Sequence, residues 1–273
     1  MRRRKRIFIS VGMLALVFLT AGCSNTKIPA QEENRSSSTQ GSGSEVQDGD
    51  MAENISAELP ETEEISSEPG PATLLYQGQA SIRVVTDEGK VIYIDPYAGD
   101  SYELPADLIL VTHAHFDHSQ TDKVENRNED CQIITYAEAV QDGEYRTFDI
   151  GYVTVKAVEA GYNSLHDAGD CVGYVLTFSN GRSVYVTGDT SKTEQMAYMD
   201  EMEIDYAFFC CDGVYNMGLE EAAECAGLVG AKHNIPYHMT TTTTGRQFDR
   251  ELAEQFDVEN RLIVEDGEEI LIE

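Results

Sequence analysis

Residues 112–118 constrain this chain more than any other segment, because they place three histidines and an aspartate within one short stretch. The segment reads Thr-His-Ala-His-Phe-Asp-His and follows the apolar run 108–111, which predicts a buried strand. Such a strand would fix the backbone while the loop directs the side chains of His113, His115, Asp117 and His118 into one space. Imidazole and carboxylate groups are ligands that zinc takes at about 2.0–2.2 Å. The segment therefore predicts a metal site at the end of a strand.

Apolar runs and turn residues predict a strand-rich domain over residues 72–273. Strands are expected at 81–85, 91–94, 108–111, 152–158, 172–178, 184–187 and 206–210, and a helix at 220–229. Ser179-Asn180-Gly181 and Asp87-Glu88-Gly89 predict hairpin turns. The segments 261–264 and 270–272 flank Asp266-Gly267 and predict a closing hairpin. Many strands with a few helices indicate an α/β or α+β domain.

The pattern His-x-His-x-Asp-His after an apolar strand resembles the metallo-β-lactamase superfamily. The resemblance covers about residues 73–273 and implies an αββα sandwich with a dinuclear metal site at the sheet edge. It matches His166 to the third ligand segment, Asp189 in Gly-Asp-Thr to the bridging carboxylate, and His238 in Ile-Pro-Tyr-His to the last ligand. His233 is a rival to His238, but the Ile-Pro-x-His context favours His238. Asp95, in Ile-Asp-Pro, matches an early aspartate that supports the ligands from beneath.

The resemblance implies two divalent metal ions with separate ligand sets. The expected ligands are His113, His115 and His166 for one ion, Asp117, His118 and His238 for the other, and Asp189 as the bridge. Zn²⁺ is the favoured ion, and Mn²⁺ or Fe²⁺ also suit such ligands. A hydroxide that bridges the ions would attack a carbonyl or phosphorus centre, with Asp117 as a catalytic residue that orients it. The implied activity is hydrolysis of a small-molecule lactone, phosphodiester or related ester.

Further motifs narrow the resemblance. Residues 172–175 and 212–222 resemble a compact branch that includes ascorbate-6-phosphate lactonase-like proteins. Members of that branch often have Gly-His near the first strand, where this chain has Gly78-Gln79, so the role of that histidine is open here. β-Lactamases usually lack a carboxylate at the position of Asp189, which implies little β-lactam turnover. Flavin-dependent di-iron relatives usually have Glu where this chain has His115.

The start of the chain has the pattern of an export signal. Five cations at residues 2–6 precede an apolar run at 7–19, which is short for a membrane-spanning helix. Leu19-Thr20-Ala21-Gly22-Cys23 resembles a bacterial lipobox, which implies a signal peptide over 1–22 and lipid on Cys23. The protein would then lie on the outer face of the cytoplasmic membrane. An ordinary cleaved signal and an uncleaved anchor are the alternatives, and all three place the domain outside the cytoplasm. The same signal fits a non-catalytic metal- or solute-binding lipoprotein, the alternative function.

Composition separates a tether from the domain and excludes one class of partner. Residues 23–71 are polar and acidic with few apolar side chains, which predicts a disordered tether. The net charge of −30 would repel the phosphates of nucleic acids. The expected partners are therefore a small molecule and the membrane. The other five cysteines lack a Cys-x-x-Cys spacing and are expected to be mostly buried and unpaired, with one disulfide left open: Cys131, Cys171, Cys210, Cys211 and Cys225.

Overall fold

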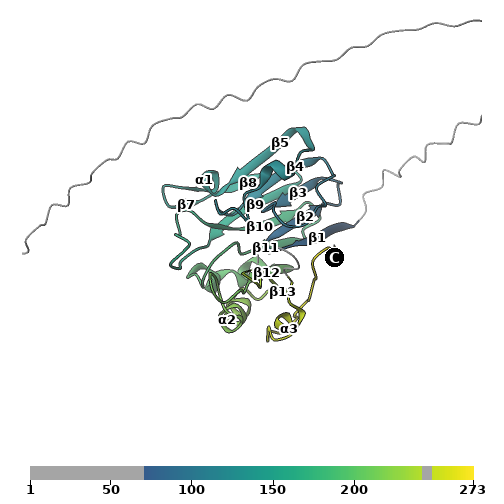
Figure 1. The fold of residues 1–273 in the computed structure, drawn as a ribbon. Coiled ribbons are helices and arrows are strands. Elements are labelled where there is room, and N and C mark those ends of the chain that lie inside the picture. Colours follow the sequence, from purple (N-terminus) through teal and green to yellow (C-terminus); the bar gives the residue numbers. More distant parts are fainter. Residues whose placement is uncertain (1–70, 242–247) are drawn as a thin grey trace, which may run out of the picture. The chain divides into compact units, whose positions relative to one another are not determined.

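The computed structural model describes residues 71–241 and 248–273, in which two six-stranded sheets form the framework (Figure 1). The signal segment, Cys23 and the expected tether lie outside the described residues. The first sheet has the order β14-β1-β2-β3-β4-β5, and the second has the order β13-β12-β11-β10-β9-β8. Among the residues described, no helix has the length and apolar character needed to cross a membrane.

The elements have the following bounds. The first sheet contains β1 Ala72–Gly78, β2 Ser81–Val85, β3 Val91–Ile94, β4 Ala106–Val111, β5 Arg127–Thr135 and β14 Glu268–Ile272. The second contains β8 Thr147–Asp149, β9 Val153–Glu159, β10 Val172–Phe178, β11 Ser183–Val186, β12 Tyr206–Cys210 and β13 His233–Tyr237. A separate hairpin pairs β6 Val140–Gln141 with β7 Glu144–Tyr145. The helices are α1 Tyr136–Ala139, α2 Leu219–Val229 and α3 Arg250–Ala253, with 3₁₀ turns η1 Thr121–Lys123, η2 Gln195–Tyr198 and η3 Asp200–Met202.

The core lies between the inner faces of the two sheets. Strand alternation places Tyr76 of β1 against Phe208 of β12, with ring centroids 6.3 Å apart. Tyr174 of β10 reaches across the interface and donates its hydroxyl hydrogen to the carbonyl of Val111, at 3.1 Å. All four residues belong to buried parts of the two sheets. These contacts between the inner faces fix the position of one sheet relative to the other.

The outer faces of the sheets are covered differently. Helix α2 buries Ala222, Cys225 and Val229 on the side of the second sheet, as expected for the predicted fold. The outer face of the first sheet is covered by the loop 96–105 and η1, where Tyr93 contacts Tyr102 with ring centroids 5.3 Å apart. A helix is not found there because the β3–β4 crossover spans only residues 95–105, about the shortest length that joins parallel strands. The expected sandwich of two sheets is found, with a loop in place of one helix layer.

The prediction of a closing hairpin at 261–272 is wrong. The described residues 261–264 form no strand, and Arg261 makes only an isolated bridge to Asn234. The segment 270–272 belongs to β14, which instead pairs antiparallel with β1, so that Ile272 lies opposite Ala72. The turn residues were interpreted as a local hairpin, whereas β14 is itself an edge strand and pairs with β1, almost 200 residues earlier in the chain.

Strands of both sheets end at one common edge. The parallel strands β3 and β4 lead into Asp95 and His113, and the parallel strands β11 and β13 lead into Asp189 and His238. The amide of Val172 donates to the carbonyl of Thr112 at 3.0 Å and joins the sheets there. A glycine is required at position 188, because φ is +62° and a Cβ atom would lie 2.8 Å from the Val172 carbonyl oxygen. The fold thus brings loops of distant sequence together at this edge.

Candidate metal centre

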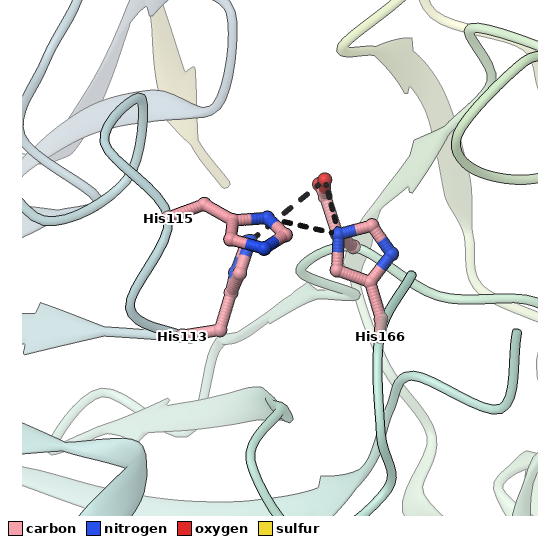
Figure 2. A group of neighbouring side chains, drawn as sticks. His113, His115 and His166 are labelled. Atoms are coloured by element: carbon pink, nitrogen blue, oxygen red, sulfur yellow. Dashed lines mark hydrogen bonds and ion pairs between the residues drawn. The ribbon is translucent and has the colours of Figure 1, made fainter. Parts of the chain in front are cut away.

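The structure brings together all seven residues that the sequence proposes as metal ligands. Their donor atoms form two groups, and within each group the atoms lie within 4.8 Å of one another. The groups are His113, His115, His166 and Asp189, and then Asp117, His118 and His238. Figure 2 shows the rings of His113, His115 and His166 converging on one point from two separate loops. His233 lies apart from the site and stacks on Tyr206 at 4.7 Å.

Asp189 lies between the two groups. Its Oδ2 atom is 3.3 Å from Nε2 of His166 and 3.9 Å from Nε2 of His113. Its Oδ1 atom faces the other group, at 3.3 Å from Nε2 of His118 and 3.4 Å from Nε2 of His238. Each carboxylate oxygen therefore serves a different group of histidines, which is the arrangement of a bridging carboxylate.

The distances between donors suit metal ions better than direct hydrogen bonds. Two ligands that each lie about 2.0–2.2 Å from a tetrahedral zinc are roughly 3.3–3.6 Å apart. The separations around Asp189 fall close to that range. In addition, Nε2 of His113, Nε2 of His118 and Oδ1 of Asp189 are buried without a hydrogen-bond partner. Since buried polar atoms are rarely left unpaired, these residues fit bound cations.

The charges of the site favour a cation as well. Burial and the neighbouring imidazoles hold the pKa of His113 well below its usual value, so its ring stays neutral. Burial opposes protonation of His118, but the carboxylates of Asp189 and Asp95 outweigh it and raise the pKa of His118 to about 9. Burial raises the pKa of Asp189, yet the surrounding histidines bring it well below its usual value. The carboxylate of Asp189 therefore stays ionised and attracts positive charge to this point.

Three polar residues hold the histidines from behind. Asp95 accepts from the backbone amide of Thr112 at 2.8 Å and lies 2.8 Å from Nδ1 of His118, in agreement with its expected supporting place. Asn163 Oδ1 lies 3.0 Å from Nδ1 of His166. Asp212 Oδ2 lies 3.5 Å from Nδ1 of His238, an ion-pair distance rather than a close hydrogen bond. Neither Asn163 nor Asp212 has a role predicted from the sequence, although Asp212 follows the end of β12 much as Asp95 follows β3.

Gln79 occupies the edge of the second group. Its Nε2 atom donates to Oδ2 of Asp117 at 2.9 Å and lies 3.0 Å from Nε2 of His238. Its carbonyl accepts from the backbone amide of His238 at 3.1 Å. Gln79, Asp95 and His238 all have φ between +46° and +51°, a conformation that costs energy for non-glycine residues and concentrates at functional sites. Gln79 thus positions two proposed ligands without being one of the seven.

A cavity of about 310 Å³ opens directly onto the two groups. Besides the metal-site side chains and Gln79, its lining contains Leu165, Tyr215 and Thr241. Thr241 belongs to the threonine-rich segment after His238. The five cysteines of the described residues are free, and four of them are buried. The cavity volume of about 310 Å³ suits a small molecule.

Comparisons with known proteins agree with this geometry. Residues 73–238 match the profile of the beta-lactamase superfamily domain. A UPF0173 metal-dependent hydrolase of Geobacillus thermodenitrificans is 31% identical over 195 residues, which cover 61% of this chain and 84% of the relative. Another of Thermodesulfovibrio yellowstonii is 28% identical over 249 residues and covers 75% of this chain and 93% of the relative.

Solved structures share the fold. A putative metal-dependent hydrolase from Parabacteroides distasonis has a TM-score of 0.57 and 25% identity, with 72% of this chain and 94% of that chain covered. Igni18, a metallo hydrolase from Ignicoccus hospitalis, has a TM-score of 0.58 and 22% identity, with 75% of this chain and 99% of that chain covered. The second likeness supports the fold alone.

Proposed function

We propose, from the premise that this chain belongs to the UPF0173 metal-dependent hydrolase family of the metallo-β-lactamase superfamily, that it uses two divalent ions to hydrolyse a small ester. The membership rests on the profile match over 73–238 and on the relative from Geobacillus thermodenitrificans. Metal-dependent hydrolysis is the activity of the family. The number of ions, the substrate and the place of the protein in the cell are our own proposals.

The observation that carries the two-ion proposal is the orientation of Asp189. Its two oxygens face two histidine groups, and each group has the donor set that zinc prefers. His113, His115 and His166 would hold one ion, and Asp117, His118 and His238 the other. Zn²⁺ is the favoured ion, and Mn²⁺ or Fe²⁺ suits the same ligands.

Two ions bound in this way would lower the pKa of a shared water to about 7 and stabilise negative charge that develops on the substrate. The chain itself supplies the orientation. Burial raises the pKa of Asp117, but His238, His118 and the hydrogen bond from Gln79 bring it below its usual value. Asp117 therefore stays a carboxylate, and it lines the cavity, where it would accept a hydrogen bond from the attacking water or hydroxide and orient it.

The substrates that fit this arrangement are lactones, phosphodiesters and related esters. Their leaving atom becomes an anion, which a pair of cations can stabilise together with the attacked centre. The likeness of 172–175 and 212–222 to lactonase-like proteins favours lactones within this set. The carboxylate at position 189 speaks against a β-lactamase.

A metal assay joined to a substrate panel tests the proposal. Purified protein loaded with Zn²⁺ is expected to retain two ions per chain and to hydrolyse a lactone or phosphodiester. His118→Ala is expected to lose one ion and most of the turnover. His233→Ala is the matched control, since His233 lies outside the site and should leave both unchanged. Two retained ions without turnover on a broad ester panel would favour the alternative, a non-catalytic binding lipoprotein.

We also propose that Cys23 carries a lipid that anchors the protein on the outer face of the cytoplasmic membrane. The support is the order of cations, apolar run and small residues before Cys23. The polar composition of 23–71 supports a flexible tether that separates the hydrolase domain, 72–273, from the membrane.

A further inference from the structure

We propose that the substrate is a neutral molecule whose alkyl or aryl body lies between Leu165 and Tyr215, while its reacting group meets the metal centre. This inference rests on the proposed function, because it names the class of ester that the same site takes. Leu165 and Tyr215 both line the cavity of about 310 Å³, together with His115, His166 and His238. The two side chains come from different loops, and we call them the Leu165 wall and the Tyr215 wall. The proposed metal ligands that line the same cavity are called its floor.

Exposed apolar side chains gather at this site. Leu165 is 52% exposed and Tyr215 is 46% exposed. Among the described residues, the large apolar side chains with such exposure are mostly found on the three loops that carry proposed ligands or the residues behind them: Phe116, Tyr162, Leu165, Val214 and Tyr215. Scattered exposed apolar residues need no explanation, but Leu165 and Tyr215 line one cavity beside the candidate metal centre, which indicates a surface that binds apolar groups.

The Leu165 wall is tied to the metal centre by Asn163. The side-chain oxygen of Asn163 accepts hydrogen bonds from the amides of Leu165 and His166, both at 3.0 Å. The same oxygen lies 3.0 Å from Nδ1 of His166. One side chain therefore fixes the loop that carries Leu165 and the ring that faces the metal centre.

The Tyr215 wall is tied to the centre in the same way by Asp212. Its Oδ1 atom accepts from the amides of Val214 at 2.8 Å and Tyr215 at 2.6 Å. Its Oδ2 atom lies 3.5 Å from Nδ1 of His238, and its side chain is fully buried. Both walls are thus preformed at fixed distances from the ligands, which reduces the ordering cost of binding an apolar body.

The charge of the protein disfavours an anionic body. Neither lysine nor arginine occurs among the described residues that line the cavity. A second cavity on the other side of Leu165 is lined by Asp167 and Asp170. Two bound cations would leave the floor positive, but they act on the reacting group, whereas a negatively charged tail would meet a protein of net charge −30 and, in the second cavity, acidic side chains. The body of the substrate should therefore be apolar and uncharged.

Binding of unreactive ketones to the zinc-loaded protein tests this inference without turnover. We expect calorimetry with 2-alkanones of rising length to show affinity that increases about two- to fourfold per methylene, as buried hydrocarbon does. A keto acid of equal length, with its carboxylate at the far end, should bind at least ~10-fold more weakly. Leu165→Ala and Tyr215→Ala should each flatten the dependence on length. Both side chains are half exposed, and equal melting temperatures would verify that the variants fold.

Tyr198→Ala is the matched control. Tyr198 is 70% exposed but does not line the cavity, so its removal should leave ketone binding unchanged. Affinity that is independent of chain length, tighter binding of the keto acid, or an equal loss in Tyr198→Ala would overturn the inference. Length-dependent binding without hydrolysis of any ester would contradict only the proposed function. Hydrolysis at a rate that does not depend on the length or charge of the ester would contradict only this inference.

Discussion

The carboxylate of Asp95 lies 2.8 Å from Nδ1 of His118, on the side of the ring opposite the Nε2 atom that faces Asp189. Both side chains are fully buried. A carboxylate in this place accepts the Nδ1 hydrogen and leaves Nε2 as the free electron pair for a metal ion. His118 is thereby held in one orientation before any ion binds, and a bound ion would displace the proton on Nε2.

Asp95→Asn is therefore expected to weaken metal binding about 10- to 100-fold while the fold persists. Asparagine tolerates the left-handed backbone at this position, where φ is +46°. A competition titration with a zinc chelator measures the change. Unchanged affinity in Asp95→Asn, next to a clear loss in His118→Ala, would show that the contact does not orient the ring.

Metal removal should lower the thermal stability of the protein. Without cations, Nε2 of His113, Nε2 of His118 and Oδ1 of Asp189 are buried without a hydrogen-bond partner. An ion present at about 100 times its dissociation constant would add ~2.7 kcal/mol to the free energy of unfolding. Melting curves with a chelator, and again after zinc is restored, measure this contribution. Identical melting temperatures in both states would mean that the site takes no ion in the folded protein.

Asp189→Ala should reduce the bound metal from two ions toward one. It should also lower kcat/KM about 10³-fold, since several kcal/mol of transition-state stabilisation depend on having both metal ions. Gln79→Ala should cost only about 10- to 100-fold, because Gln79 positions Asp117 and His238 but lies outside the ligand set. Metal content and kinetics on the best ester measure both. A larger loss in Gln79→Ala, or efficient β-lactam cleavage by the unaltered protein, would contradict the bridging role of Asp189.

Stability should depend on pH through Asp205. Burial raises the pKa of Asp205, but hydrogen bonds from Lys232 and from the amide of Ser183 outweigh it, so the pKa lies below its usual value. A lowered pKa stabilises the folded state above the unfolded pKa of about 3.9, and this contribution is lost as the pH falls through the folded value. Asp205→Asn should cost about 1–3 kcal/mol at pH 7, and the difference should narrow below pH 4. Urea unfolding of both proteins at several pH values measures this, and a gap that stays constant with pH would contradict it.

Cys23→Ala should abolish the membrane attachment. If Cys23 carries the lipid, the variant is expected in the medium or as an unprocessed precursor, and it should no longer partition into detergent. Cell fractionation and mass spectrometry of the N-terminus measure the outcome. A wild-type protein free in the medium, with an unmodified residue 23 or later at its N-terminus, would contradict the anchor.

Part of the fold was accessible from the sequence because short-range patterns define it. The apolar runs of β2, β3, β10 and β12 gave strand bounds that the structure confirms. Strand β5 was missed, because it is an exposed edge strand that begins with the polar residues Arg127, Asn128, Glu129 and Asp130. Strand β13 was missed as well, since it contains Pro236, which only an edge strand such as this one accommodates.

The candidate site, like the fold, was only partly predictable from the sequence. His113, His115 and His118 were evident because they crowd one short loop, and His166, Asp189 and His238 followed from resemblance. Asn163 and Asp212 were not assigned, since single polar residues in loops have no sequence signature of their own. Their importance appears only when folding places each beside the far ring nitrogen of a histidine.

The union of both sheets at the metal centre has a consequence for how the protein matures. His113, His115 and His118 follow β4 in the first sheet, whereas Asp189 and His238 follow β11 and β13 in the second. No contiguous fragment of the chain that ends before β13 contains both sets of donors. Ion capture with full affinity must therefore wait until the C-terminal strands have paired, so that metal uptake would mark completion of the fold. A chain released too early, or truncated before residue 238, would be recognisable by its failure to retain the second ion.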